Sequence, residues 1–460
     1  MAVPIIAIFD VGKTNKKVFF FDEQYKVVFE KSVRFDEITD EEGDPCEDLR
    51  GLSTWVRNTL SEIIKPGLFE VKAINFSSYG ASLVHVDAEG NPLTPLYNYL
   101  KPYPLYLQKQ FYEKYGGELK VSKETASPVL GSLNSGMQLY RLKYQMPELY
   151  HRISYSLHLP QYLSYLITGT PVSEVTSIGC HTGLWNFERN DYHDWVIKEG
   201  ILDKLAPISP SDSALEVQLG NRLVVVGAGL HDSSAAFIPF ITGFDEPFVL
   251  LSTGTWCISL NAFNRTPLTE NELKNDCLCY MSFKGTPVKA SRIFAGNEHE
   301  KQTKKIAAHF NLRDEFYQAL PYNPAWASKI WTDEIATLAD VDGNLAVSAF
   351  EKREIAHFGS AEDAYHQLLV DLVKMQMRST NLVLEGTGVK QIFVDGGFSK
   401  NQKYMSLLAA AYPAMKVYAA TVAQATSLGA ALTLHQRWNK KPVPHCMVDL
   451  KYYPTPELAV

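Results

Sequence analysis

Three short glycine-containing turns carry residue types that could bind phosphate, and each follows directly after an apolar run. They are Asp10-Val11-Gly12-Lys13-Thr14, Ser252-Thr253-Gly254-Thr255 and Asp395-Gly396-Gly397. Glycine lets backbone N–H groups approach an anion, Ser and Thr add hydroxyl donors, and an Asp can hold a divalent cation on the phosphates. Any one of these turns is weak evidence, because glycine turns after strands are common. Together they favour a nucleotide-binding protein.

Two familiar phosphate-binding patterns are excluded by the residues themselves. A P-loop needs a second glycine five residues before Gly12, where this chain has Ala7 inside an apolar run. The dinucleotide pattern Gly-Xaa-Gly-Xaa-Xaa-Gly begins at Gly227 and Gly229, but Asp232 stands where the third glycine belongs. The nucleotide site predicted here is therefore neither a P-loop nor a nicotinamide-binding Rossmann unit.

Asp232 follows the run Gly229-Leu230-His231 and opens a predicted helix. Asp is a favoured helix N-cap residue, so the local pattern alone fits a structural cap. Phosphoryl transfer also needs a group that accepts a proton from the attacking hydroxyl, and a carboxylate can do this as a general base. Both interpretations stay open at this point.

The elements that must position these turns are arranged similarly in the two halves of the chain. A strand at 5–9, a turn and a strand at 17–21 open the first half, and 248–251, a turn and 256–260 open the second. Gly12 and Gly254 lie at matching places in the two hairpins. Unless two short hairpins coincide by chance, this predicts two related domains, 1–242 and 243–460, with a linker at 241–247.

The pattern of apolar and turn residues predicts an α/β fold in both halves. We expect helices at 53–64, 105–115, 134–145, 159–167, 361–384, 401–412 and 423–434. We expect further strands at 26–33, 72–76, 83–86, 223–226, 391–394 and 416–419.

The composition excludes several classes of protein. The 460 residues are 46% hydrophobic and 21% charged with a formal net charge of −7, so disorder is excluded and a nucleic-acid partner is disfavoured. No apolar run approaches the roughly 18–20 residues of a membrane helix. The apolar run 3–9 is followed at once by Asp10 and Lys13, which is typical of a strand and not of a secretion signal. Six cysteines are too few for a disulfide framework, so we expect a cytoplasmic protein.

Five segments, in order along nearly the whole chain, resemble the FGGY family of carbohydrate kinases. Three of them are the two phosphate loops at Asp10–Thr14 and Ser252–Thr255 and the catalytic segment Gly229-Leu230-His231-Asp232. The others are an adenosine motif, Asp395-Gly396-Gly397-Phe398-Ser399-Lys400-Asn401, and the segment Thr182-Gly183-Leu184-Trp185. The resemblance implies two ribonuclease-H-like domains in the actin-like ATPase arrangement with an interdomain active-site cleft. The first domain would bind sugar and the second nucleotide.

The resemblance also implies roles for individual residues. Asp232 would be the general base on the sugar hydroxyl, and Asp10 would help to hold Mg²⁺. The ATP site would include Asp10, Gly12, Lys13, Thr14, Gly254, Thr255, Gly396, Gly397 and Asn401. Lys13 departs from the family, in which a small hydroxyl residue is frequent there, so it either adds a cation near the phosphates or points to solvent.

The sugar-binding region is less similar to the family than the phosphate loops. The sequence Ser77-Ser78-Tyr79-Gly80-Ala81 stands where many relatives have a Gly-Gln-Met-His-like stretch, and it resembles the rhamnulose and fuculose kinases more than the xylulose or glycerol kinases. The segment 97–101 lacks the acid that those relatives often place there. The implied substrate is a ketose, with a 6-deoxyketohexose favoured, and the implied substrate-binding residues are Ser78, Tyr79, Gly80, His231 and Asp232.

Three alternatives to a 6-deoxyketohexose kinase stay open at this level. They are a kinase for xylulose or another polyol, a non-catalytic sugar or nucleotide sensor, and an actin-like ATPase that acts on water alone. We expect ATP and a small sugar as partners and neither nucleic acid nor a membrane. A homodimer is left open, because no stretch identifies an interface.

Overall fold

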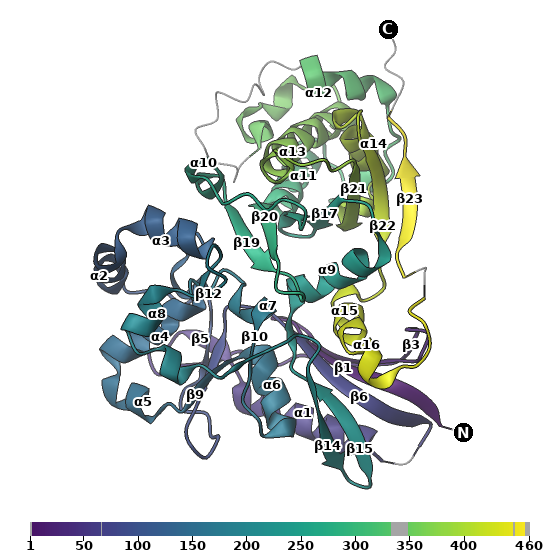
Figure 1. Cartoon of the computed structure of the whole chain (residues 1–460). Coiled ribbons are helices and arrows are strands. Elements are labelled where there is room, and N and C mark those ends of the chain that lie inside the picture. The colour runs from purple at the N-terminus through teal and green to yellow at the C-terminus, as the bar shows by residue number, and fades with distance from the viewer. Residues whose placement is uncertain (1, 66, 333–347, 445–446, 456–460) are drawn as a thin grey trace. The chain divides into compact units, whose positions relative to one another are not determined.

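The computed structural model describes residues 2–65, 67–332, 348–444 and 447–455, which form an α/β protein of two compact units (Figure 1). The first unit comprises Met1–Gly243 with two later segments, Cys279–Pro287 and Ala423–Met447. The second comprises Phe244–Leu278, Val288–Val422 and Val448–Val460. The predicted boundary after residue 242 falls one residue before this division. The observed units differ from the prediction in the two later segments, which belong to the first unit, whereas the prediction placed all of 243–460 in the second domain.

The first unit is built on one mixed sheet. Its strands are β1 (Val3–Val11), β2 (Lys16–Phe21), β3 (Val27–Val33), β6 (Phe69–Ser78), β14 (Ala214–Leu219), β15 (Arg222–Gly227) and β16 (Leu230–His231). The order is β14-β15-β6-β1-β2-β3, and β16 also pairs with β6. The hairpin partners β1, β2 and β3 run antiparallel, whereas β6 runs parallel to β1, β15 and β16. The carboxyl ends of three strands, β1, β6 and β16, therefore meet at one edge.

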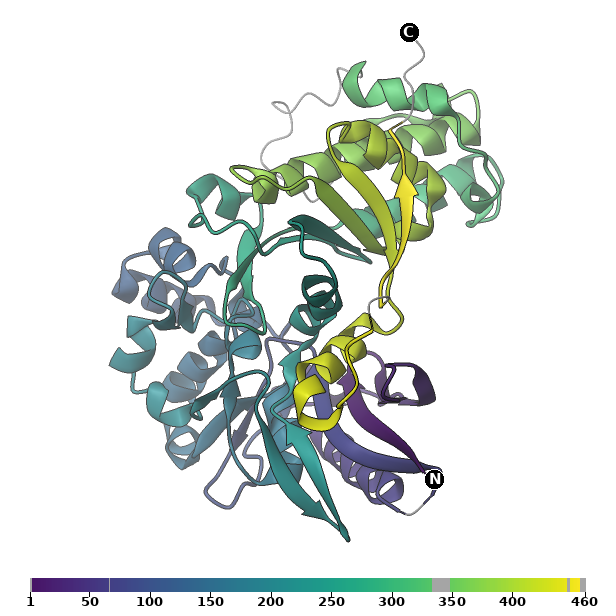
Figure 2. The same ribbon diagram turned by 45° about the vertical axis from the view of Figure 1, so that its right-hand side comes forward.

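Helices pack on both faces of this sheet. Because side chains alternate along β1, Ile5, Ala7 and Phe9 enter the core with α1 (Leu49–Ile63) and α6 (Leu159–Thr168). On the other face lie α9 (Asp232–Gly243), α15 (Ala425–Thr433) and α16 (His435–Trp438), and Figure 2 shows the yellow helices beside the purple strands. Helix α15 approaches α9 so closely that a Cβ on Gly429 would lie 1.8 Å from the Ala235 carbonyl oxygen.

A second core of the first unit is formed by the aromatic-rich segments. Phe111 contacts Trp195 and Tyr140 edge-on at ring separations of 5.0 and 5.1 Å. The elements that contribute to this core are α2 (Leu105–Tyr115), α3 (Glu118–Thr125), α4 (Ser135–Gln145), α5 (Pro147–Arg152), α7 (Val175–Ile178), α8 (Asp194–Lys198), β7 (Leu83–Val86), β11 (Trp185–Asn186) and β12 (Asp191–Tyr192). Strand β9 (Tyr155–His158) pairs with β7 and packs in the first core. Smaller pieces are β4 (Ile38–Thr39), β5 (Pro45–Glu47), β8 (Leu96–Tyr97), β10 (Ser173–Glu174) and β13 (Ile208–Ser209).

The second unit repeats the sheet order of the first. The strands of its sheet are β17 (Phe248–Thr253), β18 (Cys257–Asn261), β19 (Cys277–Met281), β20 (Pro287–Ile293), β21 (Gln391–Gly396), β22 (Lys416–Thr421) and β23 (Asp449–Tyr453), in the order β19-β20-β18-β17-β21-β22-β23. The division into units falls within β19, after Leu278. Here β17 is antiparallel to β18, β18 to β20, and β21 is parallel to β17 and β22. The series β3-β2-β1-β6-β15 thus corresponds to β20-β18-β17-β21-β22, which supports the predicted duplication.

Helices of the second unit are α10 (Glu270–Lys274), α11 (Ala295–His309), α12 (Lys329–Thr332), α13 (Ala361–Leu384) and α14 (Gln402–Ala411). The predicted helix 361–384 has the bounds of α13. The predicted helix 53–64 begins four residues too late, because Asp48 caps α1 by accepting the Gly51 N–H. The predicted last helix, 423–434, exists as α15 but belongs to the first unit. A helical pattern shows where a helix lies in the sequence but not which sheet buries it.

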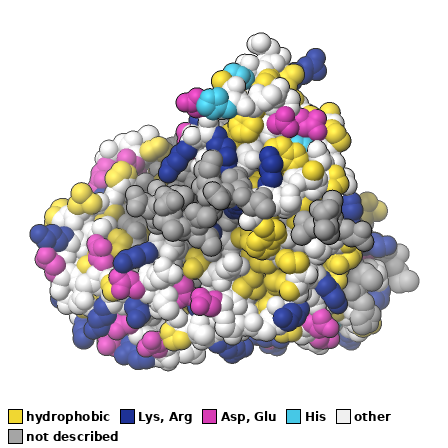
Figure 3. Space-filling model, turned by 90° about the horizontal axis from the view of Figure 1, so that it is seen from above, with side chains coloured by type: hydrophobic (Ala, Val, Ile, Leu, Met, Phe, Trp, Pro, Cys, Tyr) yellow, Lys and Arg dark blue, Asp and Glu magenta, His cyan; other side chains and the backbone are white. Residues whose placement is uncertain are grey.

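Within the described ranges, no helix has the length and apolar character needed to cross a membrane. Figure 3 shows one face of the molecule, on which basic and acidic side chains are interspersed.

Candidate active site

Register places Asp10 and Asp232 at the same edge of the first sheet. Asp10 on β1 is opposite Ser77 on β6, and Ser77 is opposite Leu230 on β16. One step further, His231 is opposite Ser78, and Asp232 begins α9 at once. The strands end together here, as at the ligand-binding edge of other parallel sheets.

The carboxylate of Asp232 has one occupied oxygen. Its Oδ1 accepts the Ser233 N–H at 2.6 Å and the Ser233 hydroxyl at 3.2 Å, and it lies 3.2 Å from His231 Nε2. Among the residues that the structure describes, Oδ2 has no hydrogen-bond partner. Desolvation by burial raises the pKa of Asp232 to about 6, and only the Ser233 hydrogen bonds oppose this. The geometry therefore presents Oδ2 as a carboxylate oxygen whose basicity suits proton transfer near neutral pH.

Asp10 is the second carboxylate at this edge. Its Oδ2 accepts the Ser427 hydroxyl at 2.9 Å, so α15 helps to position it. Burial raises the pKa of Asp10 to about 6, and repulsion from the Asp232 carboxylate adds to the rise. A nearby cation would relieve both effects by stabilising the ionised forms.

Mg²⁺ fits this arrangement only as a cation that arrives with phosphates. Within the described part of the chain, no three His, Cys, Asp or Glu residues are placed to hold a metal together. Mg²⁺ is commonly held by one or two carboxylates, substrate phosphates and water. Asp10, with a single hydroxyl partner, has the chemistry for one such ligand.

The predicted first phosphate loop is a tight hairpin tip. The Gly12 N–H donates to the Asn15 carbonyl at 3.0 Å, and Thr14 is exposed. The Lys13 ammonium contacts Glu37 at 2.7 Å and Glu47 at 3.7 Å, so it is neither free in solvent nor unpaired. Its predicted contact with phosphate would require it to exchange or share these carboxylates.

Glu47 joins this loop to the predicted sugar-binding segment. It pairs with the buried Lys16 ammonium at 2.5 Å and accepts the Tyr79 hydroxyl at 3.2 Å. The Tyr79 ring contacts the Tyr99 ring edge-on at 5.9 Å. Sequence reasoning missed Glu47, because a single acid in the short strand β5 carries no signal of its position.

The remaining predicted sugar-binding residues are buried or half-buried near Asp232. Ser78 is buried at the end of β6, and its hydroxyl donates to the Tyr79 carbonyl at 3.3 Å. Gly80 leaves no room for a side chain, since a Cβ there would lie 2.6 Å from Cys180 Sγ and 3.1 Å from His231 Nε2. Ser78, Tyr79, Gly80, His231 and Asp232 are thus brought together in the first unit.

Two glycine turns meet in the second unit. Thr253 on β17 is opposite Gly396 on β21, and its carbonyl accepts the Gly397 N–H at 2.7 Å. The Thr253 hydroxyl accepts the Phe398 N–H at 3.0 Å and donates to the Asp395 carbonyl. Gly396 has φ +89°, and a Cβ on it would lie 1.9 Å from the Thr253 carbonyl oxygen. Glycine is therefore required here, and Gly254, Thr255, Gly396 and Gly397 are held at one edge of the sheet.

A cavity of about 810 Å³ opens beside these turns. The predicted residues Gly254, Thr255, Gly397 and Asn401 line it. The Asn401 side chain caps α14 by accepting the Tyr404 N–H at 3.2 Å, and it donates to the Tyr365 hydroxyl at 2.8 Å, so its amide is already engaged.

Other cavity residues were missed by sequence reasoning. They include Gly296, His299, Tyr317, Tyr322 and Lys403, whereas Lys400, which also lines the cavity, belongs to the predicted adenosine motif. At Gly296 on α11 only glycine fits, because a Cβ there would lie 1.9 Å from the Gly254 carbonyl oxygen. The His299 ring lies edge-on to Tyr317 at 5.0 Å, and burial lowers the His299 pKa to about 4. The cavity thus combines neutral aromatic rings with backbone amides and lysines, which suits a nucleotide.

Both units match family models for one class of enzyme. Residues 5–238 match the N-terminal domain of the FGGY family of carbohydrate kinases, and residues 245–442 match the C-terminal domain of the FGGY carbohydrate kinases. The chain therefore belongs to the FGGY family of carbohydrate kinases.

Curated relatives and solved structures agree with this membership. The chain is 22% identical over 264 residues to a rhamnulokinase of Halalkalibacterium halodurans, covering 54% of each chain. It is 24% identical over 280 residues to a rhamnulokinase of Yersinia pestis strain Pestoides F, covering 57% of this chain and 55% of the relative. The chain thus spans about half the length of these curated relatives.

Two solved structures share the fold along almost the whole chain. One is a carbohydrate kinase from Novosphingobium aromaticivorans, with TM-score 0.77, 22% identity and coverage of 98% of this chain and 96% of that one. The other is a ligand-bound xylulose kinase from Lactobacillus acidophilus, with TM-score 0.79, 17% identity and coverage of 99% and 94%. The predicted α/β class and two-domain kinase fold are confirmed.

Proposed function

We propose that this protein phosphorylates a ketose hydroxyl with ATP and Mg²⁺. The observation that carries the proposal is Asp232, whose Oδ1 is occupied by Ser233 donors while Oδ2 has no partner in the described structure. With a pKa raised to about 6, the carboxylate is ionised at neutral pH yet basic enough to assist a hydroxyl. A helix N-cap side chain accepts the N–H of a residue two or three positions further on, whereas Asp232 Oδ1 accepts that of the next residue, Ser233.

In the proposed reaction, Asp232 Oδ2 takes the proton from the sugar hydroxyl. The hydroxyl oxygen then forms a bond to the γ-phosphorus, and the bond to the bridging oxygen of ADP breaks. Asp10 would hold the Mg²⁺ that accompanies the nucleotide, with Gly12, Lys13 and Thr14 near the phosphates. The cation would neutralise phosphate charge, which is its usual part in phosphoryl transfer.

The nucleotide would occupy the cavity of the second unit. Gly254 and Thr255 would contact phosphates, and Gly397 and Asn401 would line the adenosine end, while Gly396 shapes the turn that leads to them. The size of the cavity, about 810 Å³, is within the range of small-molecule sites and supports this placement.

A 6-deoxyketohexose, rhamnulose or fuculose, is the proposed sugar. Support comes from the rhamnulokinases among the relatives and from Tyr79-Gly80 in the sugar-binding segment. Similarity in fold to xylulose kinases favours xylulose as the second candidate. The cytoplasmic location stays a prediction.

The test is ADP formation with ATP, Mg²⁺ and a panel of rhamnulose, fuculose, xylulose, gluconate and glycerol. A sugar-dependent rate with rhamnulose or fuculose is expected, and Asp232→Asn should lose at least about 100-fold in kcat with its fold retained. Equal ADP formation without sugar would identify an ATPase that acts on water. Ligand binding without turnover would identify a sensor, and a near-parental rate for Asp232→Asn would remove Asp232 from catalysis.

A further inference from the structure

A buried cysteine and histidine lie behind Asp232 and are absent from the proposed reaction. Cys180 Sγ lies 3.1 Å from His231 Nε2, and the same nitrogen lies 3.2 Å from Asp232 Oδ1. The other ring nitrogen, Nδ1, lies 3.3 Å from the Ser234 hydroxyl. The His231 side chain is 5% exposed, and each of its nitrogens faces a protein atom. This ring is therefore placed to act on Asp232.

The charge state of His231 limits what the ring can do. Desolvation lowers the His231 pKa to about 3, so at neutral pH the ring carries one N–H and one lone pair. If the proton were on Nδ1, the Nε2 lone pair would face the ionised Asp232 Oδ1, and like charges would repel. With the proton on Nε2, the N–H donates to Cys180 Sγ at 3.1 Å, its positive end also lies 3.2 Å from Asp232 Oδ1, and Nδ1 accepts the Ser234 hydroxyl hydrogen. Electrostatics favours this second form.

We propose that Cys180 and Ser234 hold His231 as the Nε2–H tautomer, and that His231 in this form positions Asp232 with Oδ1 held and Oδ2 presented to the sugar hydroxyl. This inference rests on the proposed function for its kinetic consequence. Cys180 and His231 are positioning residues, and Asp232 remains the group that takes the proton.

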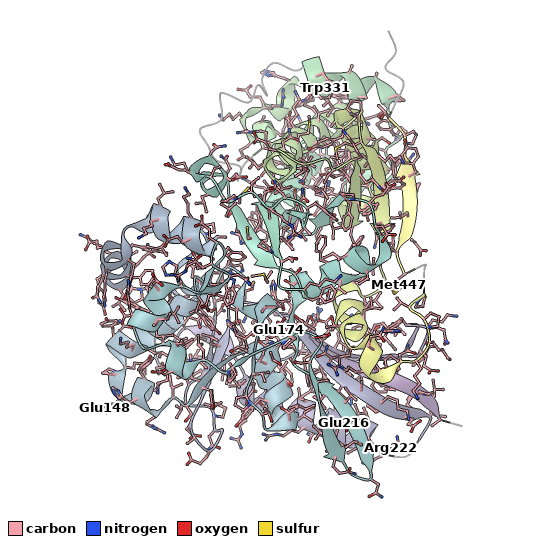
Figure 4. The ribbon with its side chains drawn as sticks, viewed as in Figure 1. Glu148, Glu174, Glu216, Arg222, Trp331 and Met447 are labelled. Atoms are coloured by element: carbon pink, nitrogen blue, oxygen red, sulfur yellow. The ribbon has the colours of Figure 1, made fainter. Side chains whose placement is uncertain are left out.

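The surroundings show how the chain fixes this arrangement. The backbone N–H of His231 donates to the Thr176 hydroxyl oxygen at 3.0 Å, and the Thr176 hydroxyl in turn donates to the Glu174 carboxylate at 2.5 Å. Glu174, labelled in Figure 4, is fully buried and caps α7. The Tyr280 ring lies 5.6 Å from the His231 ring and covers it. Backbone and ring are thus both held before any ligand binds.

Gly80 supports the same arrangement from the sugar-binding segment. Its missing side chain is what allows Cys180 and His231 to meet, because a Cβ there would lie within about 3 Å of both side chains. A glycine at this position serves the contact between Cys180 and His231 directly.

The first test reads the tautomer without any substrate. Full-length protein labelled with ¹⁵N-histidine is studied by NMR at pH 7.5, and the His231 signals are assigned by their loss in His231→Gln. We expect a protonated Nε2 and an unprotonated Nδ1 in the parent protein, and a shift toward the Nδ1–H form in Cys180→Ala and Ser234→Ala. A parent ring protonated on Nδ1, or variants with unchanged signals, would overturn the proposal.

The second test measures kinetics with the preferred sugar. We expect Cys180→Ala to lower kcat by about 10- to 100-fold, as a misplaced catalytic group does, with the sugar KM changed less than about twofold. Cys180→Ser keeps an acceptor for the Nε2–H and should recover most of the loss. Cys277→Ala removes another buried thiol, from the second unit, and should leave kcat unchanged. Equal kcat for Cys180→Ala and the parent would contradict the positioning role.

The two tests separate the inference from the proposed function. If no sugar is phosphorylated, the proposed function fails. The tautomer of His231, which is measured without substrate, still shows whether His231 is held in the form that positions Asp232. If Cys180→Ala does not fold, Ser234→Ala and the parent spectrum give the same decision.

Discussion

Asp232→Asn is expected to make the protein more stable at neutral pH while it removes activity. The Asn side chain has nearly the same shape, and its Oδ1 can still accept the Ser233 N–H. Burial raises the Asp232 pKa from 3.8 to about 6, so the ionised carboxylate opposes folding. At about 1.4 kcal/mol per pKa unit, this amounts to about 3 kcal/mol. Because the side chain is 31% exposed, solvent screens part of this cost, and we expect a gain of about 1–2 kcal/mol.

The gain should depend on pH in one direction. Below pH 3.8, Asp232 is protonated in both folded and unfolded chains, and the Asn variant has no advantage. As the pH rises toward 6, the unfolded chain releases the proton while the folded protein keeps it, so the parent loses stability. Above about pH 6 the difference is complete.

Thermal unfolding followed by circular dichroism at pH 7.5 and pH 4.5 measures this difference. At about 2–4 °C per kcal/mol for a domain of this size, the Tm of the variant should exceed that of the parent by about 2–8 °C at pH 7.5 and by less at pH 4.5. Asp212→Asn, an exposed carboxylate of the same unit, is the matched control and should not change the Tm. Destabilisation of the fold by ionised Asp232 would be refuted if the variant had a lower Tm than the parent at pH 7.5, or if its Tm exceeded that of the parent by the same amount at both pH values.

Three further outcomes follow from the site. The kcat/KM for the sugar should fall about tenfold per pH unit below about pH 6, because Asp232 becomes protonated; a pH–rate profile that stays flat to pH 5 would contradict this. Gly396→Ala should raise the KM for ATP and leave the KM for the sugar unchanged, because a Cβ would clash with the Thr253 carbonyl in the second unit. Initial rates measured with each substrate varied in turn will show whether only the KM for ATP changes. Glu47→Gln should lower the free energy of unfolding by about 3–5 kcal/mol, because it leaves the buried Lys16 charge unpaired; urea unfolding measures this loss, and a loss below about 1 kcal/mol would count against it.

Local patterns were sufficient where a turn follows a strand directly. The Gly12 and Gly254 hairpins predicted the duplication, and the small residues and Ala/Phe run that follow Asp232 predicted a helix that begins near it. Both depend on residues adjacent in sequence. For the same reason the three glycine turns, one in the first unit and two in the second, could be named, although not the Thr253 hydroxyl that joins the two turns of the second unit.

Contacts between distant segments could not be predicted in this way. The Ser427 hydroxyl that holds Asp10 lies 417 residues further along the chain, on a helix that the sequence pattern assigned to the other domain. Glu37 and Glu47, the partners of Lys13, carry no motif, and an amphipathic helix such as α11 gives no sign that Gly296 faces a turn of another segment. Such positions are set by tertiary packing, which one sequence does not contain in local form.

The duplication explains where the two sites lie, and its divergence explains what each can do. In the first sheet the carboxylate Asp10 is on the hairpin strand and is opposite Ser77 on the parallel strand. In the second sheet the order is reversed, with Ser252 on the hairpin strand and Asp395 on the parallel strand. Asp395 Oδ1 accepts the Gly396 N–H at 2.7 Å and so helps to shape a glycine turn. Asp10 instead stands near a second carboxylate that raises its pKa. One scaffold thus supplies a backbone turn in one unit and a pair of carboxylates with raised pKa in the other, a combination that the proposed phosphoryl transfer to a hydroxyl would use.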